Sequence, residues 1–256
     1  MITKIFENRF SRDYSDDKYK SMAGSETSFI RGVRSPSRRR LKAPAKRRMT
    51  PAEREEAIVK EAVGFFAEYG FEGNTRELAL RLNITQPLLY RYFPTKEALV
   101  ERVYQEVFMR RWNPFWEELV RDRTRPLRQR LVAFYQDYAR VILTYEWVRL
   151  FMFAGLKGLD FNNRYLELLR RQIFSAVVEE LRLEFGSPAI DDLPVTPLEV
   201  EAIWGLHAAI FYLGVRKFIY NMPIGSLDEI IEMKVLSFID GAKIVVGQTR
   251  MLGEAS

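Results

Sequence analysis

The sequence has no cysteine and a single histidine, His207. Without thiols the chain can form neither a disulfide nor a thiolate metal site. A single histidine also excludes most zinc and non-haem iron sites and most Ser-His catalytic centres. The chain also lacks a glycine loop that could cradle a nucleotide and the nucleophile elbow of hydrolases. We therefore expect no metal and no cofactor, and a helical small-molecule-binding enzyme is the least favoured function.

Long hydrophobic runs and a secretory signal are missing as well. The longest apolar stretch, Ala202 to Val215, is shorter than the roughly 20 residues that a membrane span needs, and His207 interrupts it. The N-terminus has no charged-then-apolar pattern of the kind that directs export. These absences predict a cytoplasmic protein without a membrane partner, in which the apolar stretch forms a buried helix.

Positive charge is concentrated in one segment near the N-terminus. The chain has a formal net charge of +6, and nine basic residues without any acidic one lie between Arg31 and Arg48. The rest of the chain is therefore net negative, and the segment favours a polyanionic partner. Because residues 1–48 show little apolar periodicity, we predict a disordered basic arm. It could contact phosphates non-specifically or enter a minor groove, or be only a solvated leader.

The remaining sequence predicts an all-α fold. Two segments, Thr50–Glu53 and Thr196–Glu199, have the pattern of a capping box with proline at the first helical position. Apolar residues then recur at helical spacing, and no alternating strand pattern persists. A first helix is expected from Thr50 to Gly70, a second starts at Asn74 or Thr75, and a third starts at Thr85. Further helices are expected over 95–111, 115–121, 126–144, 146–157, 162–185, 197–221 and 227–248. The inward face of the first helix should include Ile58, Ala62, Phe65, Phe66 and Tyr69.

Residues 74–96 predict a helix-turn-helix, because two short helices are joined by a tight turn in which Asn83 can adopt the left-handed conformation. Such a unit places the start of its second helix in the major groove of DNA. Gln86 can hydrogen-bond a base edge at two points, best to adenine, while Pro87 and Leu88 can contact a thymine methyl group.

Other side chains of this segment suit guanine, phosphate or sugar. Arg76 could reach a guanine, and four residues suit the backbone of DNA: Thr75, Tyr90, Arg91 and Tyr92. Lys96 lies in the first turn of the next helix, where the helix dipole disfavours a cation by roughly 0.3–1 kcal/mol. A phosphate at that helix start would reverse the effect. Alternatively, Tyr90 and Tyr92 are half-buried aromatics; Leu89 and Phe93 are expected in the core.

These residues resemble the TetR family of bacterial transcriptional regulators, from about Thr50 to Tyr104. The resemblance is carried by residues 65–71 (Phe-Phe-Ala-Glu-Tyr-Gly-Phe), 75–79 (Thr-Arg-Glu-Leu-Ala), 86–93 and 96–99, with Leu-Tyr-x-x-Phe-x-x-Lys at 89–96 the most specific part. It implies about nine helices, a homodimer, and repression relieved by a small ligand. It implies DNA contacts at Thr75, Arg76, Gln86, Pro87, Leu88, Tyr90, Tyr92 and Lys96. Asn83 departs from the family's usual glycine.

We predict three parts: a basic arm over 1–48, a helix-turn-helix DNA-binding domain over 49–96, and a ligand-binding and dimerisation domain over 97–256. The last part is rich in aromatic residues at helical spacing. For each of these residues alone an ordinary core position is favoured, but their density as a set favours a cavity for an apolar or aromatic ligand. The candidate ligand contacts are Trp112, Trp116, Phe134, Tyr138, Trp147, Phe151, His207 and Phe211. Glu146 and Arg149 are further polar candidates, and for His207 a core role is favoured over ligand sensing.

The last two helices are candidates for a dimer interface. Each has an apolar face, formed by Ile203, Trp204, His207, Ile210, Phe211 and Gly214 on one helix and by Ile231, Val235, Phe238, Ile239, Ala242 and Val246 on the other. Pairing with a second copy would give a four-helix bundle, in which Ala208, Gly214 and Gly241 permit close approach. A helical hairpin inside a monomer is the alternative.

The sequence therefore predicts a dimeric, sequence-specific DNA-binding repressor. Its partners would be double-stranded DNA with a near-palindromic site and a small apolar or aromatic effector that releases it. The main alternative is a non-specific nucleic-acid-binding protein whose affinity comes from the basic arm.

Overall fold

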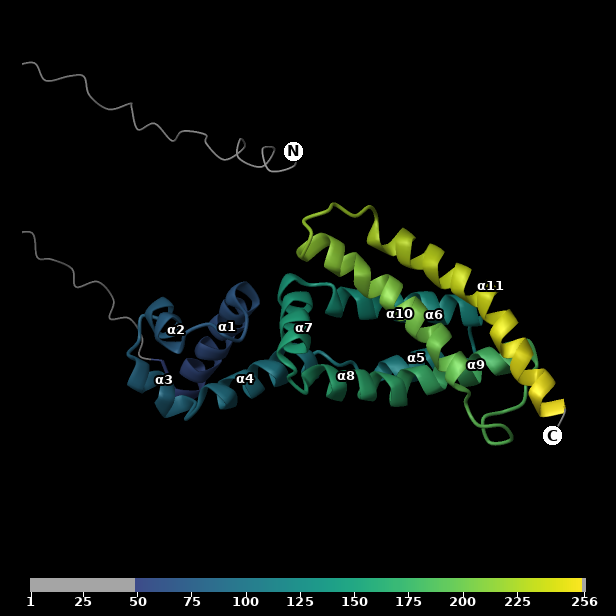
Figure 1. The fold of residues 1–256 in the computed structure, drawn as a ribbon, viewed down its shortest axis with the longest axis horizontal. Coiled ribbons are helices and arrows are strands. Elements are labelled where there is room, and N and C mark those ends of the chain that lie inside the picture. The colour runs from purple at the N-terminus through teal and green to yellow at the C-terminus, as the bar shows by residue number, and fades with distance from the viewer. Residues whose placement is uncertain (1–48, 255–256) are drawn as a thin grey trace, which may run out of the picture. The chain divides into compact units, whose positions relative to one another are not determined.

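The computed structural model describes residues 49–254, with side chains to residue 247, so the basic arm predicted over 1–48 lies outside the described residues. Within that range all regular structure is helical (Figure 1), which confirms the all-α fold class. If each π-helical turn is counted with the helix that it continues, residues 49–254 form ten helices. This is one more than the family resemblance implied.

The first four helices follow local capping signals. They are α1 (Pro51–Tyr69), α2 (Thr75–Arg81), α3 (Gln86–Tyr92) and α4 (Lys96–Tyr104), the last continued by a π-helical turn over Gln105–Met109. The capping box predicted at Thr50 is present: its side chain accepts from the Glu53 amide, and the Glu53 carboxylate accepts from the Thr50 amide at 2.7 Å. Gly70 ends α1 at φ 74°, a backbone conformation that favours glycine.

The larger part of the chain consists of longer helices. They are α5 (Phe115–Arg121), α6 (Leu127–Ile142), α7 (Tyr145–Lys157), α8 (Phe161–Leu169), a π-helical turn (Arg170–Phe174), α9 (Ser175–Phe185), α10 (Pro197–Phe218) and α11 (Leu227–Glu254). In Figure 1, α8 and α9 form one continuous helix, and α10 and α11 are connected by a loop. α11 packs mainly against α6 and α10, while α7 packs against α1 and α10. α7 therefore contacts both the first helix and the interior of the larger part.

α10 begins at Pro197, where the sequence predicted a helix start, and ends at Phe218, three residues before the predicted end. Its capping box at Thr196 starts the helix before the apolar run begins, so it extends for 22 residues. Among the described residues it is the one helix that could cross a membrane by length and composition alone, so the expectation that no segment is long enough was wrong. In the structure 44% of its most apolar 18-residue window is buried. Glu199 and His207 are buried inside the chain as well, which favours a core helix.

The apolar faces predicted for a dimer interface lie mostly inside this chain. Ile203, Ile210, Val235 and Ile239 are buried in its core. A Cβ at Gly214 would lie 2.8 Å from side-chain atoms of both Leu143 and Val148, so this glycine serves close packing within the chain. That assignment was wrong because periodicity reveals an apolar face without identifying the helices that cover it, which are mainly α11 and α7 for α10, and α6 and α10 for α11.

Other faces of the same two helices are exposed. They carry Gly205, Ala208 and Tyr212 on α10, and Met233, Gly241 and Ile244 on α11. Tyr212, Met233 and Ile244 expose 51%, 54% and 69% of their surface, respectively. Ala208 and Gly241, where the sequence predicted close approach of another helix, are both exposed, and a Cβ built on Gly241 would have no atom within 4 Å.

A buried ion pair fixes the loop between α9 and α10. Arg182 and Glu199 are almost fully buried, and two guanidinium nitrogens donate to the two carboxylate oxygens at 2.7 Å each. The same guanidinium donates to carbonyls of the loop, including that of Pro194 at 3.1 Å. The Glu199 carboxylate also accepts from the Thr196 amide and hydroxyl, but neither of these groups is charged, so removal of either member of the ion pair should be costly.

Candidate DNA interface and aromatic core

The helix-turn-helix forms as the local sequence requires. The Asn74 side chain accepts from the Arg76 amide at 2.8 Å and so caps α2, and Thr85 and Thr95 cap α3 and α4 in the same way. Asn83 has φ 52°, the left-handed conformation predicted for the turn. Asn83 therefore makes this turn without the glycine that is usual in the family.

Thr75 connects the two helices of this unit. It is buried, its Oγ1 lies 3.0 Å from the Tyr90 hydroxyl, and it accepts a hydrogen bond from Nε2 of Gln86 at 3.3 Å. The side chain at the start of α2 thus positions two side chains of α3. The predicted contact of Thr75 with phosphate stays a prediction, and the structure adds a positioning role that the sequence pattern did not indicate.

The other predicted DNA contacts are accessible to different degrees. Arg76, Pro87, Tyr90 and Arg91 are exposed, whereas Gln86, Leu88, Tyr92 and Lys96 are partly buried. The structure brings them together on α2, α3 and the first residue of α4. Leu89 and Phe93 are buried, as predicted for residues that hold the unit together.

Arg81 attaches α2 to α1. Its guanidinium donates to Oε2 of Glu68 at 3.0 Å and to the Tyr69 hydroxyl at 2.7 Å, and it lies 4.8 Å from the Tyr69 ring centroid. The hydrogen bond from Arg81 lowers the pKa of the Glu68 carboxyl. Tyr69 exposes 45% of its surface, so its assignment to the inward face was wrong. It lies at the edge of the core, where its ring packs and its hydroxyl remains accessible to Arg81.

Arg149 of α7 contacts the end of α1. Its Nε donates to the Ala67 carbonyl at 2.5 Å and a terminal nitrogen donates to the Glu68 carbonyl at 3.2 Å. These are carbonyls of the last turn of α1, which the helix itself leaves unpaired. Phe153, one turn along α7, packs against Gly70, where an added Cβ would lie 3.2 Å from the ring. Arg149 was a candidate ligand contact from sequence, and the structure places it at α1 instead.

The predicted ligand contacts form one continuous aromatic cluster. Trp116 lies 5.1 Å from the ring centroids of both Trp112 and Tyr138, and Tyr138 lies 5.6 Å from His207. On the α7 side, Trp147 and Phe151 stack at 4.8 Å, and Phe211 packs against both. Phe134 packs against Trp116 and Tyr138. Tyr165, which the sequence did not single out, joins the two groups through Trp112 and Trp147.

Polar atoms inside this cluster are only partly paired. Trp116 Nε1 donates to Asp137 at 2.7 Å, but Trp147 Nε1 has no hydrogen-bond partner among the described residues. Burial raises the pKa of Tyr138 well above its usual value and lowers that of His207 from 6.5 to about 4. Both side chains are therefore neutral at neutral pH.

Comparisons with known proteins agree with this geometry. Residues 58–103 match the model of a family described as bacterial regulatory proteins, tetR family. Over 92 residues the chain is 32% identical to tetracycline repressor protein class A from transposon 1721 of Escherichia coli. That match covers 33% of this chain and 42% of the relative, so the chain spans less than half of that protein's length.

Solved structures share the fold across most of the chain. A TetR family transcriptional regulator from Pseudomonas syringae pv. tomato aligns with a TM-score of 0.50 at 18% identity, over 75% of this chain and 97% of its own. A TetR-like regulator from Rhodococcus sp. aligns with a TM-score of 0.54 at 18% identity, over 76% and 100%.

The fold and residues 74–96 thus define a helix-turn-helix module joined to a larger helical part. Through this module, at residues 58–103, the chain is similar to the TetR family of bacterial regulatory proteins.

Proposed function

We propose that the protein is a cytoplasmic, sequence-specific DNA-binding regulator. In this proposal it represses transcription as a dimer and is released from a near-palindromic operator by a small ligand. The observation that carries the proposal is the α2–α3 unit, in which Thr75 positions Gln86 and Tyr90 within the segment that matches the TetR family model. Double-stranded DNA is therefore the proposed macromolecular partner.

Within the interface we assign base reading and phosphate binding to different residues. Gln86, Pro87, Leu88 and Arg76 would read base edges, because they start the two helices of the unit. Five residues would hold the backbone of DNA: Thr75, Tyr90, Arg91, Tyr92 and Lys96. Residues 49–96 would then be the DNA-binding domain and 97–256 the ligand-binding and dimerisation domain.

The aromatic cluster is the proposed effector site. A buried hydrogen-bonding group without a partner costs about 1–3 kcal/mol, and the cluster contains one on Trp147. A planar or apolar ligand with a hydrogen-bonding atom could pair with such a group while its rings pack among the aromatic residues. Because Trp147 and Phe151 share α7 with Arg149, a ligand there would act on the helix that contacts the end of α1.

A homodimer through α10 and α11 is proposed on the exposed faces of these helices. Tyr212, Met233 and Ile244 present apolar surface to solvent, and Gly205 and Ala208 would allow another helix to approach closely. Pairing with the same face of a second copy would bury these side chains in a four-helix bundle. The two DNA-binding domains would then face two half-sites related by the same symmetry.

Two single variants test the DNA assignment. Gln86→Ala should change the base preference, whereas Lys96→Ala should weaken binding to all sequences similarly and reduce its salt dependence. The affinity of each variant for a selected site and for substituted duplexes can be measured over a range of salt concentrations. If Gln86→Ala and Lys96→Ala have the same effect on every duplex, the division between base and phosphate contacts is wrong.

The basic arm supports a second candidate, a non-specific nucleic-acid binder. Nine basic residues between Arg31 and Arg48 could supply affinity without reading sequence. Removing residues 1–48 distinguishes the two functions. The truncated chain should lose nearly all DNA binding if the arm drives it, and should keep its sequence preference at reduced affinity if α2 and α3 do.

A further inference from the structure

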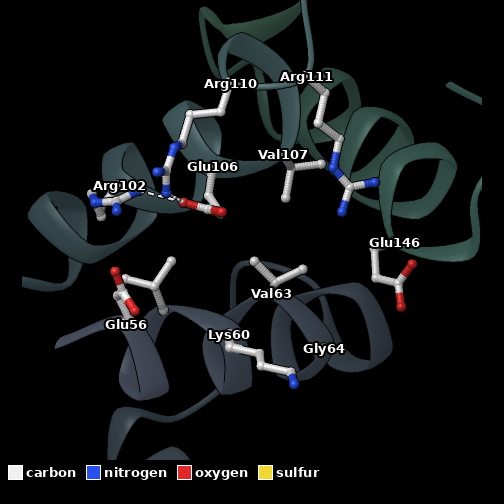
Figure 2. Close-up of a pocket in the computed structure, with 11 residues that line it drawn as sticks. Glu56, Lys60, Val63, Gly64, Arg102, Glu106, Val107, Arg110, Arg111 and Glu146 are labelled. Carbon is white, nitrogen blue, oxygen red and sulfur yellow. Dashed lines mark hydrogen bonds and ion pairs between the residues drawn. The ribbon is translucent and has the colours of Figure 1, made fainter. Parts of the chain in front are cut away.

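A crevice with a volume of about 510 Å³ lies apart from the aromatic cluster, between α1 and the π-helical turn that continues α4 (Figure 2). Val59 and Val63 of α1 and Val107 of the π-helical turn contribute its apolar surface. Its volume is in the range of sites that bind small molecules.

The charges around the crevice are unequally paired. Arg102 and Arg110 both donate to the Glu106 carboxylate, at 2.9 and 2.8 Å, so these three side chains largely satisfy one another. Lys60 and Arg111 also line the crevice, and neither side chain forms an ion pair or a hydrogen bond within residues 49–247.

Figure 2 shows Lys60 on α1 and Arg111 on the opposite wall, with Glu146 of α7 at the same end and Glu56 near Arg102. Neither acid forms an ion pair with Lys60 or Arg111 in the described part of the chain. The lining contains four basic and three acidic residues, so it is net positive. This balance favours an occupant with one negative charge.

Gly64 keeps the crevice open. It lies in the middle of α1 and lines the crevice, and a Cβ built on it would have no atom within 4 Å. Apart from proline, glycine is the least favourable residue in a helix interior. No close packing requires glycine here, so the structural consequence of Gly64 is the open space that any side chain would fill.

We propose that this crevice binds a small organic anion with a short apolar body, whose carboxylate lies between Arg111 and Lys60 and whose apolar part contacts Val63 and Val107. The site is separate from the proposed effector site, and the proposal does not depend on DNA binding. Because its walls belong to α1 and to the helix that leads away from the DNA-binding unit, an occupant would bridge these two elements.

Thermal unfolding of the full chain tests the site with hexanoate as the probe. Hexylamine and hexanol have the same body with the opposite charge or no charge. Hexanoate should raise the Tm at constant ionic strength, whereas the other two should not. Arg111→Ala or Lys60→Ala should weaken hexanoate binding by about 10- to 100-fold, because each removes a charged hydrogen-bond donor.

Two further variants separate this site from any other. Gly64→Met fills the crevice without changing a charge and should abolish the shift. Arg171→Ala removes the same charge as Arg111→Ala from an exposed position outside the crevice and should leave the shift unchanged. A shift that persists in Arg111→Ala and Gly64→Met, equal stabilisation by hexylamine, or no stabilisation of the wild type would each overturn the proposal. If Gly64→Met does not fold, the Lys60 and Arg111 variants decide the question.

Discussion

Replacing Thr75 with valine removes one hydroxyl and keeps the β-branched shape of the side chain. The Thr75 hydroxyl lies 3.0 Å from that of Tyr90 and accepts from Gln86 at 3.3 Å. A hydrogen bond of this kind contributes about 0.5–1.5 kcal/mol. Because Tyr90 is exposed and water can replace its lost partner, we expect the free energy of unfolding to fall by only about 1 kcal/mol.

The informative effect of Thr75→Val is on base preference. A well-placed two-point contact discriminates against a wrong base by about 1–3 kcal/mol, and Gln86 loses the neighbour that orients its amide. We expect discrimination at the base read by Gln86 to fall by about 1 kcal/mol, or about fivefold. Fluorescence anisotropy with the preferred duplex and with one substituted at that base would measure it.

Thr75→Ser is the matched control, because it keeps the hydroxyl. It should discriminate between the two duplexes nearly as the wild type does. If Thr75→Val keeps full discrimination, or if Thr75→Ser loses as much as Thr75→Val, the Thr75 hydroxyl does not orient Gln86 for base reading.

Four further predictions concern stability, coupling and assembly. Burial lowers the pKa of His207 from 6.5 to about 4. Between these two pH values the imidazole is therefore mostly protonated in the unfolded chain and mostly neutral in the folded chain. The free energy of unfolding should fall by about 3 kcal/mol as the pH drops from 6.5 to below 4. In urea unfolding at several pH values, His207→Gln should lack this part of the pH dependence. Arg182→Ala leaves Glu199 charged and buried, and should cost about 3–5 kcal/mol in the same assay, much more than an exposed arginine variant. Arg149→Ala should speed amide hydrogen exchange in the last turn of α1 and leave α10 unaffected; unchanged exchange would contradict the contact's role. Ala208→Arg should shift the chain to monomers in sedimentation velocity with its helical circular dichroism preserved, and a retained dimer would place the interface elsewhere.

Features encoded in a few neighbouring residues were predictable from sequence. The capping boxes at Thr50 and Thr196 are local, so the starts of α1 and α10 were correctly predicted. Asn83 adopts the conformation expected for the turn, and the core positions Leu89 and Phe93 follow from the same short segment. The family resemblance then correctly implied the fold of the larger part.

Features that depend on contacts between distant helices were not predictable. The spacing of apolar residues on α10 shows that it has an apolar face, but only the structure shows that α7 and α11 cover most of it. Arg149 looked like a polar residue in an aromatic region, and its contact with Ala67 joins residues 82 positions apart. The paired hydroxyls of Thr75 and Tyr90 were missed because their alignment depends on how α2 packs on α3.

In the proposed function, the segment containing Gln86 and Thr75 reads a DNA sequence. Selection by the full chain from a pool of random duplexes at physiological salt tests it most directly. We expect enrichment of one near-palindromic site, with two half-sites related as the subunits of a dimer are. Recovery of unselected sequence, with equal affinity for all duplexes, would contradict it.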